Sequence, residues 1–444
     1  MGLDLRFAGS VSGNVITKYQ QRRPFKEVRE LEKKYRSKTR RLSEYQKLMS
    51  ARNEQKGVYN WFPFFQAFTS SFLGKTFKRQ EVRESQKILD PFAGSGNTLV
   101  ACVEFGKKGY GFDVNPLFQF IAQVKTREYS NNHFEKAEKI VWEAMNRNTD
   151  VAVEVPRLSS FEKLFNPEIL KKLIILRNTA LEEENEESAS LLLFALVSQL
   201  LNCSSAKRYG KGLHIKEKPC EKEVERLILN KLRKMRMEYT GFRNSAKKLG
   251  SAHVVPYSIL ELEKAEKVPV VDAVITSPPY CNSSDYVEMY KLELWFLGYV
   301  TRRSEFRELS CRTVRSHLSF NDSDTKWSHP TIDAICHALD AMELWNSRLP
   351  LMIRGYFDDM HSSLVKIGDK LKNNGKVIFV IGNSSYEGIV IPSDLLLAEA
   401  AEDLEFKVET IEVARNLSSS PQQKKMMDEH SRSLMRESIV TLSR

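Results

Sequence analysis

The tetrapeptide Ser277-Pro278-Pro279-Tyr280 combines residue types that can hold a flat group bearing an amine. It directly follows residues 270–276, a β-branched, apolar run that predicts a buried parallel strand. The two prolines end that strand, because neither ring nitrogen can donate to a ladder and each restricts the residue before it. The Ser hydroxyl and Pro carbonyl can accept hydrogen bonds from an exocyclic amine of a nucleobase, and the Tyr ring can stack on the base. The alternative is an ordinary proline-terminated strand with a core tyrosine.

A second motif, at residues 90–98, has the composition of a nucleotide-binding corner. Residues 87–90 predict a short strand and residues 99–105 a helix, with Gly94 and Gly96 between them. Glycine allows positive φ and close backbone approach, and the amino end of the helix favours polar or anionic groups. The three-glycine spacing of a dinucleotide fold and the lysine of a P-loop are both missing from this motif, which argues against NAD and ATP.

A third feature is the acid that ends the next predicted strand, at residues 109–116. Asp113 follows the glycine turn by about twenty residues, the offset at which a carboxylate reaches ribose hydroxyls. Its alternative role is to cap the helix that begins near Pro116, and both roles can coexist.

In this order, the loop and the turn resemble the signatures of the amino-methyltransferase family of DNA modification enzymes. The family carries an Asp-Pro-Phe-x-Gly-Ser-Gly-type loop and a Ser/Asn/Asp-Pro-Pro-Tyr/Phe turn. The resemblance implies S-adenosylmethionine as methyl donor, and it implies that Ser277, Pro278, Pro279 and Tyr280 hold a flipped base. The serine in first position is most similar to the N4-cytosine enzymes. The cofactor residues that the resemblance implies are Asp90, Pro91, Phe92, Ala93, Gly94, Ser95, Gly96, Thr98, Asp113 and Asn115.

The turn also suggests a mechanism. An exocyclic amine is a poor nucleophile, because its lone pair is delocalised into the ring. Hydrogen bonds to the Ser277 hydroxyl and the Pro278 carbonyl would localise that lone pair toward the sulfonium methyl, so direct transfer needs no covalent intermediate. Methylation of cytosine C5 would instead need a Cys nucleophile, and Pro219-Cys220 lies in a charged stretch that predicts a surface loop.

Length and composition limit the fold class, the disulfide and metal content and the cellular location that we expect. With 444 residues and 41% hydrophobic content, the chain can bury one large α/β core and an added domain. The six cysteines form no Cys-x-x-Cys pair and the eight histidines show no metal spacing, so we expect neither a disulfide framework nor a metal site. With no signal peptide or long apolar span, we expect a cytoplasmic protein of a bacterial or archaeal cell, without a membrane partner.

The formal net charge of +11 fits a polyanionic partner such as double-stranded DNA. Lys and Arg are concentrated in residues 1–60, which predicts a basic N-terminal arm that contacts phosphates. A solvated helix face is the alternative. The arm residues for which we predict DNA contacts are Arg22, Arg23, Lys33 and Lys34.

The remaining strands are predicted within residues 252–260, 375–383, 406–414 and 437–442. With the three strands above, they predict an α/β fold with a seven-stranded doubly wound, Rossmann-like methyltransferase sheet. Residues 61–130 would form its cofactor-binding half and residues 251–444 its catalytic half. The aromatic-rich segment 59–72 either encloses the methionine end of the cofactor or packs in the core. Family members often have an acid after the third strand, where this chain has Tyr257 and Ser258.

Two segments are candidates for target recognition. Residues 131–250 predict a helical insertion, and within it the basic stretch 204–212 predicts a flexible loop whose Lys207 and Arg208 contact DNA. A purely structural helical lid is the alternative. Residues 301–354 are a second candidate, which either contacts DNA or closes over the flipped base.

These features predict a site-specific DNA methyltransferase that acts on N4 of cytosine in duplex DNA by base flipping. The expected setting is a restriction-modification system with a cognate restriction endonuclease. Three alternatives stay open: N6-adenine methylation of DNA, methylation of an RNA or tRNA base, and a non-catalytic DNA-binding subunit with a methyltransferase fold.

Overall fold

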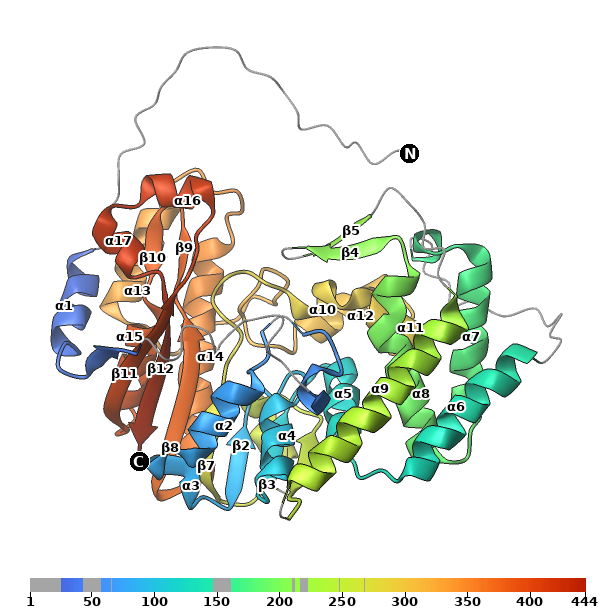
Figure 1. The fold of residues 1–444 in the computed structure, drawn as a ribbon. Coiled ribbons are helices and arrows are strands. Elements are labelled where there is room, and N and C mark those ends of the chain that lie inside the picture. The colour runs from blue at the N-terminus through green and yellow to red at the C-terminus, as the bar shows by residue number, and fades with distance from the viewer. Residues whose placement is uncertain are drawn as a thin grey trace, which may run out of the picture.

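The computed structural model describes residues 25–42, 57–64, 66–146, 161–209, 212–215, 223–246, 248–266 and 268–444. Within these ranges an eight-stranded sheet runs through the molecule in the order β1-β11-β12-β8-β7-β2-β3-β6 (Figure 1). Its strands are β1 (Thr39–Arg41), β2 (Lys87–Asp90), β3 (Lys108–Phe112), β6 (Ser251–Val255), β7 (Val271–Thr276), β8 (Leu371–Gly382), β11 (Lys407–Asn416) and β12 (Arg436–Ser443).

Strand β12 is antiparallel to both of its neighbours, and the other neighbouring pairs of the sheet are parallel. The chain runs from β2 outward to β3 and β6, and then returns to β7 on the other side of β2. An open sheet of this kind binds its ligand at the carboxyl ends of the strands, beside that reversal. The predicted doubly wound sheet with its seven strands is confirmed, and β1 adds an eighth strand, paired in parallel with β11.

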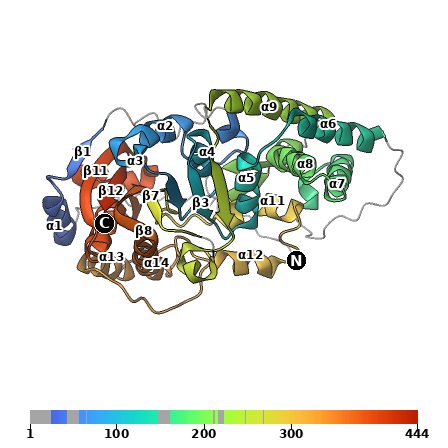
Figure 2. The same ribbon diagram turned by 90° about the horizontal axis from the view of Figure 1, so that it is seen from below.

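Helices cover both faces of the sheet. Viewed from below, the sheet lies between α2 (Ser70–Lys78) and α4 (Asn97–Glu104) on one side and α13 (Pro330–Asp340) and α14 (Leu349–Lys370) on the other (Figure 2). Central strands must then be apolar on both faces, which is why residues 377–381 of β8 are all buried hydrophobics.

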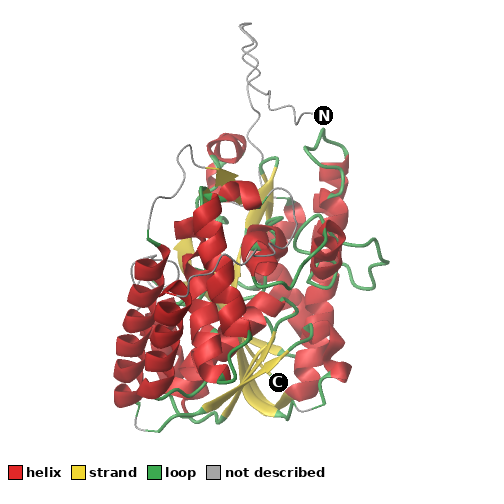
Figure 3. Cartoon of the chain, turned by 90° about the vertical axis from the view of Figure 1, so that its right-hand side faces the viewer, coloured by secondary structure: helices red, strands yellow, loops and turns green. Residues whose placement is uncertain are grey.

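Four helices pack against one another beside the sheet, next to α5 (Pro116–Thr126). They lie in the segment where the sequence predicts a helical insertion, and Figure 3 shows them from their own side. Helix α8 lies within this group and is buried along most of its length. The four helices are α6 (Asn131–Asn146), α7 (Pro167–Leu181), α8 (Glu186–Gln199) and α9 (Val224–Ser245).

The remaining elements are short, apart from α15, which packs on α14 and β11. They are α1 (Lys26–Lys34), α3 (Gln80–Arg83), α10 (Tyr286–Met289), α11 (Lys291–Phe296), α12 (Arg303–Ser310), α15 (Ser393–Glu402), α16 (Pro421–Met426), α17 (Glu429–Ser433), the 3-10 helices η2 (Gly57–Asn60), η3 (Glu162–Leu164), η4 (Leu200–Cys203) and η5 (Ile259–Lys264), and the hairpin strands β4 (Ala206–Tyr209), β5 (Gly212–Ile215), β9 (Ser384–Tyr386) and β10 (Ile389–Ile391).

The prediction of a flexible loop at residues 204–212 is wrong. Strands β4 and β5 pair there as an antiparallel hairpin. Arg208 is buried, since its Nη2 donates to Glu293 Oε1 at 2.6 Å and its guanidinium carbon lies 4.0 Å from the centroid of the Tyr290 ring. Arg208 therefore ties the hairpin to α11 and is not available to DNA phosphates, whereas Lys207 is exposed.

The basic segment near the N-terminus is described only in part, and Arg22 and Arg23 lie outside the described residues. Helix α1 packs at the outer edge of the sheet, close to α13 (Figure 1). The Lys34 ammonium contacts carboxylate oxygens of Glu399 at 2.7 Å and Glu402 at 2.9 Å. Lys34 is thus paired within the molecule, which counts against its predicted phosphate contact, whereas Lys33 is exposed.

Among the described residues, no helix is long and apolar enough to cross a membrane. In the same ranges, no group of three or more His, Cys, Asp or Glu side chains is placed to hold a metal ion.

Candidate active site

The glycine corner connects β2 to α4. Gly94 and Gly96 have φ of +49° and +76°, which residues with a side chain rarely adopt. A Cβ on Gly96 would stand 2.6 Å from Cβ of Ala122 on α5, so this glycine lets two helices pack closely. Asp90, at the end of β2, is buried and accepts hydrogen bonds from the Thr276 hydroxyl at 2.6 Å and from the Phe92 amide at 3.1 Å.

Asp113 holds the glycine corner from the end of β3. Its Oδ2 accepts from the Gly94 amide at 2.9 Å, and its Oδ1 accepts from the Asn115 amide at 2.8 Å. The helix cap is Asn115, whose side chain accepts from Leu117, so Asp113 does not itself cap α5. Each Asp113 oxygen keeps a lone pair for another donor. Burial raises the pKa of Asp113 to about 7 and that of Asp90 to about 6, because a desolvated carboxylate is disfavoured.

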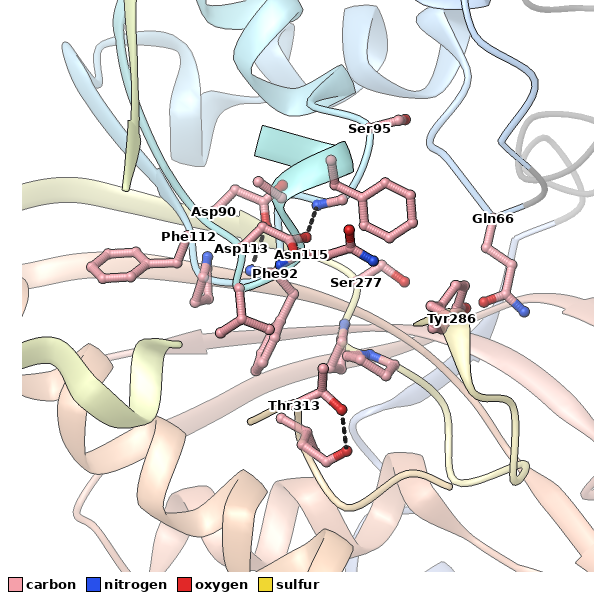
Figure 4. Close-up of a pocket in the computed structure, with 18 of the residues that line it drawn as sticks. Gln66, Asp90, Phe92, Ser95, Phe112, Asp113, Asn115, Ser277, Tyr286 and Thr313 are labelled. Atoms are coloured by element: carbon pink, nitrogen blue, oxygen red, sulfur yellow. Dashed lines mark hydrogen bonds between the residues drawn. The ribbon is translucent and has the colours of Figure 1, made fainter. Parts of the chain in front are cut away.

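A cavity, which we call the Asp90 pocket, lies over the carboxyl ends of β2, β3, β6 and β7 (Figure 4). Every predicted cofactor residue except Gly96 lines it, as do Ser277, Pro278 and Pro279. Figure 4 shows Asp90, Asp113 and Asn115 gathered on one side of Ser277, with Gln66 and Tyr286 on the other. Lining residues that the sequence did not single out individually are Phe64, Gln66, Ala67, Phe68, Asn97, Phe112, Val114, Phe118, Tyr286, Val287, Thr313, Val314, Ser316 and His317.

The aromatic segment before the glycine corner is divided between the wall of the Asp90 pocket and the core. Phe64 and Phe68 line the Asp90 pocket. Trp61 and Phe62 are buried in the core, where both rings pack edge-on against Phe194 of α8. The fold of this segment decides which aromatic residues line the pocket and which lie in the core. The amino-acid composition of the segment does not predict that division.

Two further walls of the Asp90 pocket come from loops. Tyr257 and Ser258 line it where family members often have an acid, and the Ser258 hydroxyl accepts from Leu260 at the start of η5. Thr313, Val314, Ser316 and His317 form the other wall. Arg315 anchors this wall on α14, since its Nη2 lies 2.7 Å from Asp358 and 2.6 Å from Asp359. Part of the second candidate recognition segment therefore lines this pocket.

A second cavity, the Tyr280 pocket, adjoins the first. Four residues line both cavities, namely Gln66, Ala67, Phe68 and Ser277. Tyr280 lines only the second, together with Asn383, Arg415 and Glu437 among others. Ser277 therefore stands where the two cavities meet.

Tyr280 is held by groups from three strands. Its hydroxyl donates to Glu437 Oε1 at 2.7 Å, and Glu437 Oε2 accepts from Arg415 Nε at 2.6 Å. A Cβ on Gly382 would stand 2.7 Å from Cε2 of the ring, so the ring packs directly on the backbone of β8. Burial raises the pKa of Tyr280 well above its ordinary value, which keeps the phenol protonated. The sequence assigned no role to Arg415, and it placed Glu437 only at the start of a strand.

No protein-family model matches the chain. The chain is 26% identical to the Type II methyltransferase M.AvaI of Nostoc sp., an alignment that covers 92% of this chain and 91% of that protein. It is 25% identical to the Type II methyltransferase M.BsoBI of Geobacillus stearothermophilus, over 87% of this chain and 86% of that protein. A third relative, the Type II methyltransferase M.MvaI of Kocuria varians, is 22% identical over 72% of this chain and 75% of its own length.

Among solved structures, an rRNA methyltransferase, aviRa of Streptomyces viridochromogenes, superposes with a TM-score of 0.30 and 9% identity, over 86% of this chain and 87% of that chain. A superposition this loose does not bear on the function.

The doubly wound sheet with its antiparallel β12, the paired pockets and these relatives define the class, a methyltransferase. More particularly, the chain is similar over most of its length to Type II methyltransferases.

Proposed function

We propose that this chain transfers a methyl group from S-adenosylmethionine to the exocyclic N4 amine of cytosine in duplex DNA. The observation that carries the proposal is the meeting of the Asp90 pocket and the Tyr280 pocket at Ser277. Direct transfer requires the methyl donor and the acceptor amine in adjacent sites that share one boundary, and Ser277 stands on that boundary.

The residues of the Asp90 pocket fit S-adenosylmethionine, which supplies an electrophilic methyl group when bound. Asp113 keeps lone pairs for ribose hydroxyls. Asn115 Nδ2 is a buried donor in the pocket wall that has no partner among the described residues, so it is free to bond a polar group of the cofactor. The aromatic rings of Phe112 and Phe118 offer apolar surface for the adenine.

Ser277, where the two pockets meet, and Pro278, in the wall of the Asp90 pocket, would accept the two amine hydrogens, and Tyr280 would stack on the base extruded into the Tyr280 pocket. A base inside a duplex cannot reach this pocket, so the target nucleotide must flip out. The choice of cytosine depends on Ser277, because serine in first position is most similar to the N4-cytosine enzymes. The competing proposal is adenine N6.

Digestion of methylated DNA to nucleosides, followed by mass spectrometry, tests the base. We expect N4-methylcytosine. If N6-methyladenine is the only product, the target base is adenine and not cytosine. Single-molecule sequencing of DNA from cells that express the protein would also report the recognised site. The relatives' Type II character leads us to propose a cognate restriction endonuclease as a cellular partner.

Two other functions are tested separately. A tritiated-methyl assay that compares duplex DNA with tRNA distinguishes DNA from RNA methylation, and we expect incorporation into DNA only. Calorimetry with S-adenosylmethionine tests the non-catalytic alternative, which a failure to bind would support.

We also propose that the duplex approaches from the side of the hairpin β4–β5. Strand β5 lies next to α10, which follows the Ser-Pro-Pro-Tyr turn, and Figure 1 places both above the sheet. Lys207, exposed on β4, could contact backbone phosphates there. In this proposal residues 61–130 and 251–444 form the catalytic domain, and residues 131–250 carry target recognition.

A further inference from the structure

Four polar groups in the Tyr280 pocket form a continuous chain. The Ser277 hydroxyl lies 3.4 Å from Tyr280 Oη, and Tyr280 Oη lies 2.7 Å from Glu437 Oε1. Glu437 in turn accepts from Arg415, at 2.6 Å from Nε to Oε2 and at 3.2 Å from Nη2 to Oε1. The Glu437 side chain is only 3% exposed, so water does not compete freely for it.

The sheet register builds this arrangement. Glu437 of β12 is the direct cross-strand partner of Gly382 on β8 and of Arg415 on β11. One row across three strands therefore supports Tyr280, with backbone under its ring at Gly382 and a carboxylate at its hydroxyl. Because the row is made of paired strand positions, it holds the phenol more firmly than a loop would.

The direction of each hydrogen bond in the chain follows from the groups themselves. A guanidinium only donates and a carboxylate only accepts, so the Tyr280 proton must point at Glu437. Tyr280 Oη then has only lone pairs left, and Ser277 must be the donor in their contact. The lone pairs of Ser277 Oγ remain for the substrate.

We propose that Arg415, Glu437 and Tyr280 form a positioning relay that fixes the Ser277 hydroxyl as an acceptor for the target amine. The inference rests on the proposed methylation of an exocyclic amine. A serine hydroxyl that rotated to donate to the amine nitrogen would engage the lone pair that must attack the methyl group. The relay prevents that rotation, while stacking by the Tyr280 ring is a separate contribution. The long Ser277 contact is of the kind that tightens in a catalytic complex.

A double-mutant cycle tests the relay. Tyr280→Phe keeps the ring and removes the hydroxyl, so we expect kcat to fall about tenfold or more while KM for DNA and the affinity for S-adenosylmethionine stay within about twofold. In a Ser277→Ala background the same change should cost nothing further, because the hydroxyl acts only through Ser277. Equal losses in both backgrounds, in an enzyme that folds and methylates DNA, would overturn the relay.

Glu437→Gln tests the next member with little change in volume. We expect kcat to fall several-fold, and Tyr280→Phe should mask most of that loss. Glu409→Gln is the matched control, since Glu409 pairs with Lys376 at 2.6 Å on the same sheet and lines neither pocket. If Glu437→Gln and the control variant have the same kcat, Glu437 does not take part in the relay.

The result for the relay is distinguishable from the result for the proposed function. If the enzyme methylates adenine, the proposed target base is wrong, but the double-mutant cycle still tests the relay, because adenine also presents an exocyclic amine. A wild-type protein that binds S-adenosylmethionine but methylates no DNA would overturn the proposed function and the relay with it. An additive cycle in an active enzyme would overturn the relay alone.

Discussion

Gly382 of β8 lies under the ring of Tyr280, so closely that a Cβ at Gly382 would stand 2.7 Å from ring carbon Cε2. This contact couples a strand of the sheet core to the turn that follows β7. The orientation of Tyr280 therefore depends on a residue more than a hundred positions away in the sequence.

Gly382→Ala should displace the Tyr280 ring. The φ of Gly382 is not positive, so alanine suits the strand backbone and the fold should persist. We expect methylation to fall about tenfold or more, a transition-state loss of about 1.4 kcal/mol or greater, with cofactor affinity unchanged. The control is Gly241→Ala, where a Cβ meets nothing within 4 Å. Activity equal to that of the control would show that the ring tolerates a shift.

Tyr280→Ala removes the stacking surface as well as the hydroxyl. Binding of DNA with an extruded base should weaken by about 1–3 kcal/mol, the usual range for base–aromatic stacking. Turnover should fall strongly, while calorimetry should show S-adenosylmethionine affinity close to wild type, because Tyr280 does not line the Asp90 pocket. A large loss of cofactor affinity would contradict the division into two pockets.

Cofactor binding should depend on pH through Asp113, whose pKa is raised to about 7 by burial. Ribose hydroxyls donate more strongly to the ionised carboxylate, so affinity should be full well above pH 7 and fall as the pH drops through 7. Calorimetry between pH 7 and 8 measures the slope where Asp90, with a pKa near 6, is mostly ionised. Asp113→Asn should bind weakly with a flatter profile, and unchanged affinity in Asp113→Ala would contradict the ribose assignment.

Lys125 should make stability depend on pH. Its ammonium is buried and donates to the Ser95 carbonyl at 2.8 Å, and burial lowers its pKa to about 7. Between pH 7 and its ordinary pKa the unfolded chain binds a proton that the folded chain does not, so stability rises with pH there. The limit is about 1.4 kcal/mol per pH unit. Urea unfolding from pH 7 to 9 should show a smaller slope for Lys125→Met. Lys231, whose pKa is lowered to about 8 by burial, contributes to the slope that remains.

Neighbouring residues of β4 should separate DNA contact from folding. Lys207→Gln should reduce the salt slope of DNA binding by about 0.9 if it contacts one phosphate, without changing the melting temperature. Arg208→Gln should instead destabilise the fold by about 3–5 kcal/mol, since it leaves the buried Glu293 carboxylate without its cation. Calorimetric melting and binding titrations at several salt concentrations check both. An unchanged salt slope for Lys207→Gln would show that Lys207 is a solvated surface residue that does not contact DNA.

The sequence by itself determined the features that depend on neighbours along the chain. The strand that ends at Asp90, the positive-φ glycines after it and the strand that leads into Ser277 all follow from local propensity and backbone sterics. Asp113 could be predicted in the same way, because parallel strands of one sheet deliver their carboxyl ends to one edge.

Only the tertiary structure decided which distant groups complete the site. Glu437 and Arg415 reach Tyr280 through the register of β12 with β8 and β11, and register depends on the packing of whole strands. Arg208 has the composition of a surface cation, yet it is buried because Glu293 and the Tyr290 ring lie beside it. Pairing partners and burial are properties of the packed molecule, so a local pattern specifies the turn that presents Ser277 but not the residues that orient its hydroxyl.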